Sequence, residues 1–155
     1  MNDSISRREL LVRGAALALG GTTLARILDA GAPKTPMLVY KDPGCGCCVK
    51  WVDLMRTSGF EISTRDTTGM PAIKRRYNVP EALASCHTAL VGGYVIEGHV
   101  PADLIRKLLA EKPKLTGLTV PGMVAGSPGM EGGQKQAYDV LTFDAAGRTT
   151  VYAKR

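Results

Sequence analysis

The sequence lacks an apolar run long enough to cross a membrane securely. Residues 15–28 come closest, but this stretch is short and Arg26 interrupts it, whereas a spanning helix needs about 20 mainly apolar residues. The chain also has no long low-complexity linker, so we expect one domain built around one core.

The apolar stretch fits an export signal instead. Ser6-Arg7-Arg8-Glu9-Leu10-Leu11 precedes it and resembles the twin-arginine signal, and Ala30-Gly31-Ala32 follows with the small-x-small pattern of a signal-peptidase site. We therefore expect a twin-arginine-type signal peptide at residues 1–32, a mature domain at residues 33–155 and a periplasmic protein. Membrane attachment is expected only if the signal stays uncleaved.

Clustered basic charge and aromatic residues are also scarce. Only 5% of the residues are Phe, Trp or Tyr, and the chain without residues 1–32 would have 16 basic and 11 acidic residues, a net charge of +5 over 123 residues. The one short basic run, Lys74-Arg75-Arg76, has no interleaved aromatic residue. Nucleic-acid binding requires a basic patch, which is absent here, so we expect no nucleic-acid partner.

Cysteine is rare but concentrated. Three of the four cysteines lie in Cys45-Gly46-Cys47-Cys48, directly after an apolar run at residues 37–40, and Cys86 precedes a second apolar run at residues 88–91. If the two runs are neighbouring strands, all four thiols converge on one site. A helix that begins at Cys47 or Cys48 would direct its unpaired N–H groups at the sulfurs and stabilise thiolates. A disulfide or inert buried thiols are the alternative, since exported proteins often carry disulfides.

The periodicity predicts the order β-α-β-α-β-β-α. In this order the elements are expected at residues 37–41, 50–58, 60–65, 72–77, 88–91, 94–97 and 101–109, with a further helical turn at residues 80–85. Gly92-Gly93 suits the tight turn of a hairpin, and Pro101 suits the first position of a helix. This order, with cysteines after the first strand, is the thioredoxin/glutaredoxin arrangement.

The C-terminal part adds two features. Gly and Pro residues throughout 117–133 predict a loop, and residues 138–143 and 149–152 predict a second hairpin around Asp144-Ala145-Ala146-Gly147 that packs on the domain. The predicted fold class is therefore α/β, thioredoxin-like, with an added C-terminal loop and β-hairpin.

Two functions compete for the cysteine cluster. Cys45-x-x-Cys48 after a strand is typical of a thiol–disulfide oxidoreductase, in which Cys45 attacks and Cys48 resolves. Cys47 would interfere by capturing mixed disulfides. In addition, Cys86-His87-Thr88 stands where oxidoreductases of this fold carry a proline.

Extra thiols and a histidine favour a metal site. Soft thiolates and thioethers select Cu(I), and three sulfurs so close in sequence suggest thiolates that bridge more than one copper. Zinc is the weaker candidate, because the spacing lacks the second Cys-x-x-Cys or the histidine pair of usual structural zinc sites.

Methionine or histidine is expected to complete the site. Met123 and Met130 lie in the predicted loop, where each could bind copper through its thioether or anchor the loop on apolar surface. His87 and His99 are further candidates, with a hydrogen-bonded structural histidine as the alternative. Neighbours on a strand point to opposite faces, so Cys86 and His87 enter one site only if the backbone is irregular there. Trp51 is expected to pack in the core.

Several segments in order resemble the CopG-like copper-resistance proteins. They are residues 40–52 around the cysteine cluster, Ser85-Cys86-His87-Thr88-Ala89, residues 93–102, Val120-Pro121-Gly122-Met123 and residues 126–131. The resemblance spans roughly residues 37–143. It implies a periplasmic thioredoxin-like protein that binds copper and takes part in copper tolerance, with copper ions and another copper-handling protein as partners.

Overall fold

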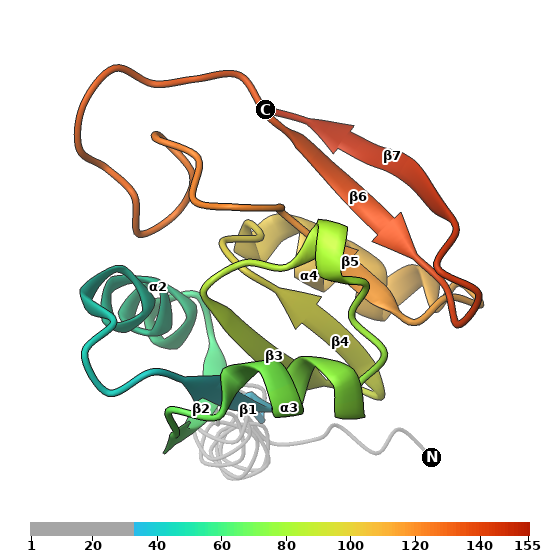
Figure 1. The fold of residues 1–155 in the computed structure, drawn as a ribbon, viewed down its shortest axis with the longest axis horizontal. Coiled ribbons are helices and arrows are strands. Elements are labelled where there is room, and N and C mark those ends of the chain that lie inside the picture. Colours follow the sequence, from blue (N-terminus) through green and yellow to red (C-terminus); the bar gives the residue numbers. More distant parts are fainter. Residues whose placement is uncertain (1–32) are drawn as a thin grey trace, which may run out of the picture. The chain divides into compact units, whose positions relative to one another are not determined.

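The computed structural model describes residues 33–155 (Figure 1). The predicted signal peptide, residues 1–32, lies outside the described residues, so export and cleavage stay predictions. No helix within residues 33–155 combines the length and the apolar character that crossing a membrane requires.

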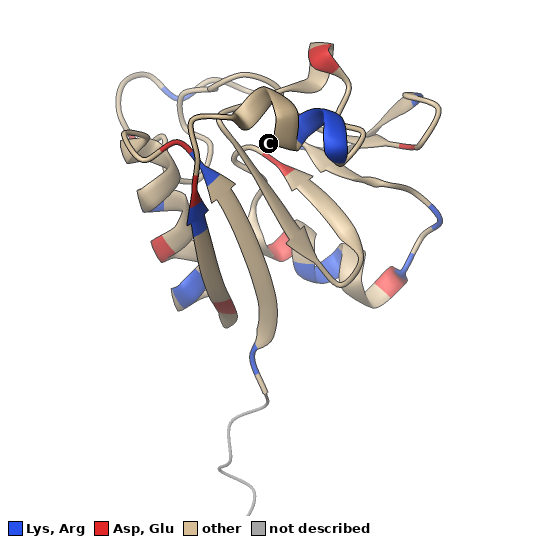
Figure 2. Cartoon of the chain, turned by 60° about the horizontal axis from the view of Figure 1, so that its bottom comes forward, with Lys and Arg blue, Asp and Glu red and all other residues tan. Residues whose placement is uncertain are grey.

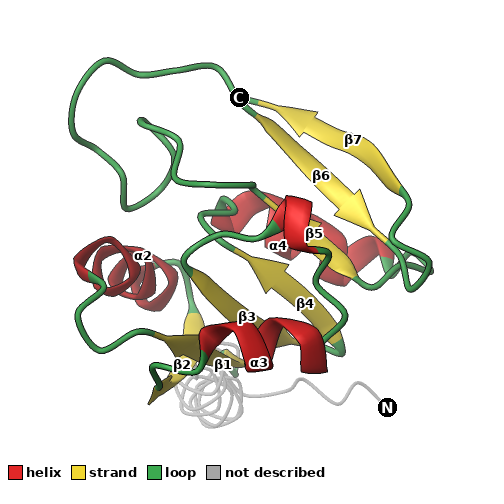
Figure 3. Cartoon of the chain, in the orientation of Figure 1, coloured by secondary structure: helices red, strands yellow, loops and turns green. Residues whose placement is uncertain are grey.

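Residues 33–155 form strands and helices in nearly the predicted order (Figure 3). The elements are β1 (Thr35–Lys41), α2 (Gly46–Thr57), β2 (Phe60–Asp66), α3 (Met70–Arg76), a 3-10 turn (Glu81–Leu83), β3 (His87–Val91), β4 (Tyr94–Glu97), α4 (Ala102–Glu111), β5 (Gly117–Thr119), β6 (Asp139–Phe143) and β7 (Thr149–Lys154). The predicted order β-α-β-α-β-β-α is present from β1 to α4.

All seven strands belong to one mixed sheet in the order β2-β1-β3-β4-β5-β6-β7. β1 pairs with β2 in parallel and with β3 antiparallel, and β3 and β4 form the predicted hairpin. The parallel pair is joined through α2, as a crossover requires. The apolar runs before the first cysteines and after Cys86 are therefore neighbouring strands.

The C-terminal hairpin was predicted to pack on the domain, but it extends the sheet. Residues 117–133 were expected to be loop throughout, yet Gly117–Thr119 form β5, which pairs in parallel with β4 and antiparallel with β6. The strand escapes prediction because three residues give too little periodicity. Its backbone hydrogen bonds to two neighbouring strands decide its conformation.

The sheet has one core on each face. α2 and α4 cover one face through Trp51, Val52 and Ile105, which pack with Val39 and Ile96 of the strands. On the other face, Val95 and Phe143 pack with Val79 and Leu83 from the segment between α3 and β3. The two faces therefore carry separate sets of side chains, and alternation along each strand decides which set a residue joins.

Helix ends differ slightly from the prediction. α2 begins at Gly46, four residues before the predicted 50–58, with Cys45 as its N-cap residue. Gly46 and the cysteines carry little helical signal, so the sequence pattern misses this first turn. Pro101 is the N-cap of α4 rather than its first helical residue.

Basic residues are spread over the helices, strand ends and loops of the described chain (Figure 2). The basic run Lys74-Arg75-Arg76 forms the last turn of α3. Lys74 forms an ion pair with the buried Glu97, so only part of this run is free to meet a ligand.

Gly117 should be required for the junction between β4 and β5. A Cβ atom there would overlap the carbonyl oxygen of Val95 and lie 3.0 Å from the Phe143 ring. We expect Gly117→Ala to lower the free energy of unfolding by about 1–3 kcal/mol in chemical denaturation, as overpacking does. Gly132→Ala is the control, because nothing lies within 4 Å of its added Cβ. Equal stability of the two variants would contradict this contact.

Candidate metal centre

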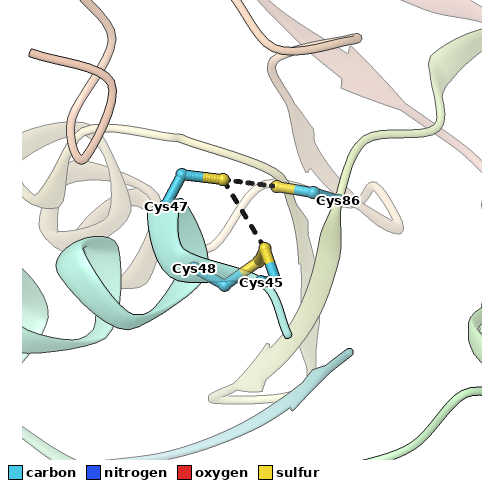
Figure 4. Close-up of side chains that lie close together, drawn as sticks. All are labelled: Cys45, Cys47, Cys48 and Cys86. Carbon is cyan, nitrogen blue, oxygen red and sulfur yellow. Dashed lines mark hydrogen bonds between the residues drawn. A yellow bond between two sulfur atoms is a disulfide. The ribbon is translucent and has the colours of Figure 1, made fainter. Parts of the chain in front are cut away.

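The pairing of β1 with β3 brings the four cysteines together. Lys41, at the end of β1, is opposite His87, at the start of β3. The chain then turns into α2, with the Cys45 N–H donating to the carbonyl oxygen of Asp42 at 3.1 Å. Cys47 Sγ lies 3.5 Å from Cys45 Sγ and 3.9 Å from Cys86 Sγ (Figure 4). The predicted convergence of the thiols is therefore observed.

Two of the four sulfurs are oxidised in this structure. Cys45 and Cys48 form a disulfide across the first turn of α2, while Cys47 and Cys86 are free thiols. A disulfide sulfur is not a thiolate, so this form of the site offers two thiol ligands. Reduction by two electrons and two protons would provide four.

His99 is oriented by the loop that follows β5. Its Nδ1 lies 2.7 Å from the carbonyl oxygen of Pro128, and its Nε2 lies 2.9 Å from Cys86 Sγ. Because a carbonyl oxygen only accepts, Nδ1 carries the proton. The lone pair of Nε2 is therefore directed at the sulfur site, in the tautomer that a metal ligand needs.

His87 lies beside the same sulfur. Its Nδ1 is 3.4 Å from Cys86 Sγ, while its buried Nε2 has no hydrogen-bond partner within residues 33–155. The Trp51 ring lies 4.4 Å from the imidazole, centroid to centroid, and Trp51 Nε1–H donates to the carbonyl oxygen of Val100 at 3.0 Å. Trp51 is fully buried, as predicted, and it also limits the movement of His87.

Cys86 and His87 contribute to one cluster although they are neighbours in sequence. The ligand atoms of Cys86, His87 and His99 all lie within 4.8 Å of one another. The alternation rule does not separate Cys86 from His87, because β3 begins at His87 and Cys86 lies outside the ladder. The backbone irregularity that the sequence argument required is therefore present.

Burial keeps the Cys86–His99 side of the site uncharged. Burial, together with the neighbouring Cys47, raises the pKa of the Cys86 thiol to about 12. Burial also lowers the pKa of both His87 and His99. The sequence predicted stabilised thiolates at the start of α2, but Cys86 is a protonated thiol near pH 7. A metal ion must therefore displace its proton to bind.

The loop after β5 packs directly on α2. Gly129 has a φ of +84°, and a Cβ atom there would lie 2.9 Å from both the Cys47 carbonyl oxygen and the Trp51 backbone nitrogen. Only glycine fits this approach without strain. The close packing brings the Pro128 carbonyl oxygen to His99, so the loop forms one wall of the site.

The two candidate methionines differ in position. Met130 lines an open pocket of about 320 Å³ together with Cys47 and Lys50. Met123 is 63% exposed. The structure thus places Met130 beside a cysteine and Met123 on the surface.

Several contributing residues escaped the sequence analysis. Pro128 acts through its carbonyl oxygen, which no side-chain pattern reveals. Glu97 and Lys74 form a buried ion pair behind the site. The signal for Glu97 is an acidic residue in the apolar strand Tyr94–Glu97, since a buried carboxylate requires partners.

Solved structures similar to this chain belong to copper resistance. The structure titled "Copper resistance protein copG, Form 2" is 40% identical, with a TM-score of 0.75, and the match covers 79% of this chain and 98% of that chain. Form 1 has the same identity and coverage, with a TM-score of 0.74. Residues 83–130 match the family described as "Protein of unknown function, DUF411". No curated protein matches the chain.

The thiols should react as two pairs. Without reductant, unfolded protein should incorporate two alkylating groups, at Cys47 and Cys86, and after reduction four. In the native protein, alkylation of Cys86 should be slow at pH 8 and rise about tenfold per pH unit, because only the thiolate reacts and its pKa is about 12. Peptide mass spectrometry measures both. Rapid alkylation of native Cys86 at pH 8 would contradict its burial as a thiol.

Gly129→Ala should separate the loop from α2. We expect a loss of about 1–3 kcal/mol in the free energy of unfolding, from backbone strain and from overlap with α2. Gly133→Ala is a matched control, because Gly133 has a φ of +93° but nothing within 4 Å of an added Cβ. Chemical denaturation of both variants measures the difference. A loss no larger than that of Gly133→Ala would show that strain alone matters.

Proposed function

The chain belongs to the family of CopG-like copper-resistance proteins, and from this membership we propose that it is an exported protein that holds Cu(I) and contributes to copper tolerance. The observation that carries the proposal is the convergence of sulfur and imidazole ligands at Cys86 Sγ, 2.9 Å from His99 Nε2 and 3.9 Å from Cys47 Sγ. Thiolate sulfur selects Cu(I), and imidazole binds copper in both oxidation states. Zinc is the less favoured metal.

Two groups of ligand atoms support more than one copper ion. Cys45, Cys47, Cys48 and Cys86 form one group, and Cys86, His87 and His99 form the other. Cys86 belongs to both, so its sulfur is placed to bridge a copper held by thiolates and a copper held by imidazoles. We include thiolate bridging in the proposal for this reason, with Met130 as the methionine nearest a cysteine.

The disulfide connects copper binding with redox chemistry. Reduced Cys45 and Cys48 carry two electrons, so their oxidation to the disulfide would convert two Cu(II) to two Cu(I) and release two protons. The proposal therefore includes redox cycling of copper at this site. Whether the protein stores copper or passes it to another periplasmic copper-handling protein depends on a partner.

A thiol–disulfide oxidoreductase is the second candidate, and the Cys45–Cys48 disulfide at the start of α2 favours it. A thioredoxin-like core is part of both proposals, because the strand order β2-β1-β3-β4 and the element order from β1 to α4 suit that fold. Against the enzyme, Cys47 Sγ lies 3.5 Å from Cys45 Sγ. At this distance Cys47 could attack a mixed disulfide before the resolving thiol does.

Copper retention tests the first candidate. Reduced protein loaded anaerobically with Cu(I) and then desalted should retain copper, as measured by elemental analysis. Cys47→Ser combined with Cys86→Ser should retain far less, because both free thiols are removed and the bridging position is lost. Unreduced wild-type protein, with the disulfide intact, should also retain less than reduced protein.

Two results would reject a copper site of this kind. One is absence of copper from reduced wild-type protein, and the other is undiminished retention by the double variant. Turnover of a disulfide substrate by metal-free protein, maintained in Cys47→Ser, would instead support the oxidoreductase.

A further inference from the structure

A buried ion pair lies directly behind the cysteine–histidine cluster. Glu97, at the end of β4, is fully buried, and its carboxylate meets the Nζ of Lys74 from α3, whose side chain is 14% exposed. Burying this pair is costly unless hydrogen bonds satisfy the remaining oxygens. Its surroundings therefore indicate what the pair holds in place.

Both carboxylate oxygens of Glu97 bind the segment that carries Cys86. Oε1 accepts from the Ser85 backbone N–H at 2.6 Å, and Oε2 accepts from Thr88 Oγ1 at 2.7 Å. Thr88 is also the cross-strand neighbour of Glu97. One side chain thus holds the chain on both sides of Cys86 and His87.

These contacts explain how Cys86 and His87 reach the same site. Along β3, His87 and Ala89 lie on the face covered by α2, while Thr88 lies on the face of Lys74 and Glu97. A strand continued backward would place Cys86 on the face of Thr88. The Ser85 N–H binds Glu97 instead, and Cys86 Sγ reaches His99 Nε2 on the other face.

The same segment is held from a second side. Ser85 Oγ donates to the carbonyl oxygen of Gly122, and the Gly122 N–H donates to the carbonyl oxygen of Ala84 at 3.1 Å. A Cβ at Gly98 would collide with the Ser85 side chain and lie 2.8 Å from the Val120 carbonyl oxygen. Ser85 therefore has little freedom to move once Glu97 binds its amide.

We propose that Glu97 is a positioning residue for the metal site: its carboxylate holds Ser85 and Thr88 so that Cys86 and His87 face the same ligand cluster. The inference rests on the proposed copper function for its metal readout. Residues that orient metal ligands without touching the metal typically change metal affinity by about 10–100-fold. Glu97 reaches the ligand segment through one backbone amide and one hydroxyl.

Three substitutions separate positioning from stability. Glu97→Ala removes both contacts. Glu97→Gln removes the charge but can still accept from Ser85 through its carbonyl oxygen and donate to Thr88 through its amide. Lys74→Met breaks the ion pair and leaves the contacts to Ser85 and Thr88. If Glu97→Ala does not fold, Thr88→Val removes one of the two contacts at nearly constant volume.

Each variant is measured in three ways: thermal midpoint, Cu(I) affinity against a chromophoric chelator, and alkylation rate of native metal-free Cys86. Glu97→Ala should weaken Cu(I) binding about 10–100-fold and accelerate Cys86 alkylation, since the ligand segment loosens. Lys74→Met and Glu97→Gln should lower the thermal midpoint yet keep Cu(I) affinity and alkylation close to wild type. Thr88→Val should lie between wild type and Glu97→Ala in both readouts.

The outcomes distinguish this inference from the proposed function. If Lys74→Met loses Cu(I) affinity as Glu97→Ala does for the same drop in thermal midpoint, Glu97 has only a structural role. If Glu97→Ala binds Cu(I) as wild type does, the inference is also overturned. If wild-type protein binds no Cu(I), the proposed function fails, while the alkylation rates of metal-free protein still decide whether Glu97 positions Cys86.

Discussion

The antiparallel pairing of β1 with β3 is the constraint on which the site depends. It places His87 opposite Lys41, so Cys86 reaches the start of α2 although 39 residues separate it from Cys47. Any shift of this register by one residue would exchange the faces of β3 and turn His87 away from Trp51. The sheet therefore determines which chemistry the cysteine motif can perform.

The second constraint is burial without charge. Cys86 is a thiol with a raised pKa and both histidines are neutral, so the metal-free site avoids the cost of isolated buried charges. Metal binding would exchange the Cys86 proton for a cation, which couples affinity to pH. The charged pair Lys74–Glu97 lies on the opposite face of the sheet, where each charge compensates the other.

The loop from β5 to β6 completes the enclosure. Close contact of Gly129 with α2 fixes the loop, and the Pro128 carbonyl oxygen then selects the tautomer of His99. The Gly and Pro residues that mark this stretch as irregular are thus the residues that let its backbone approach the helix and an imidazole. The pocket beside Cys47 remains open, with Met130 in its lining, so a ligand exchanged there need not cross the core.

The sequence alone determined the order of elements from β1 to α4, both hairpins and the gathering of four thiols, because apolar periodicity and turn residues are local signals. It also carried the family resemblance, which the similar solved structures confirm. It did not reveal β5, the sheet position of the C-terminal hairpin, the Cys45–Cys48 disulfide or the contacts of Pro128 and Glu97. Those depend on backbone groups and side chains distant in sequence, and only the tertiary structure decides which of them meet.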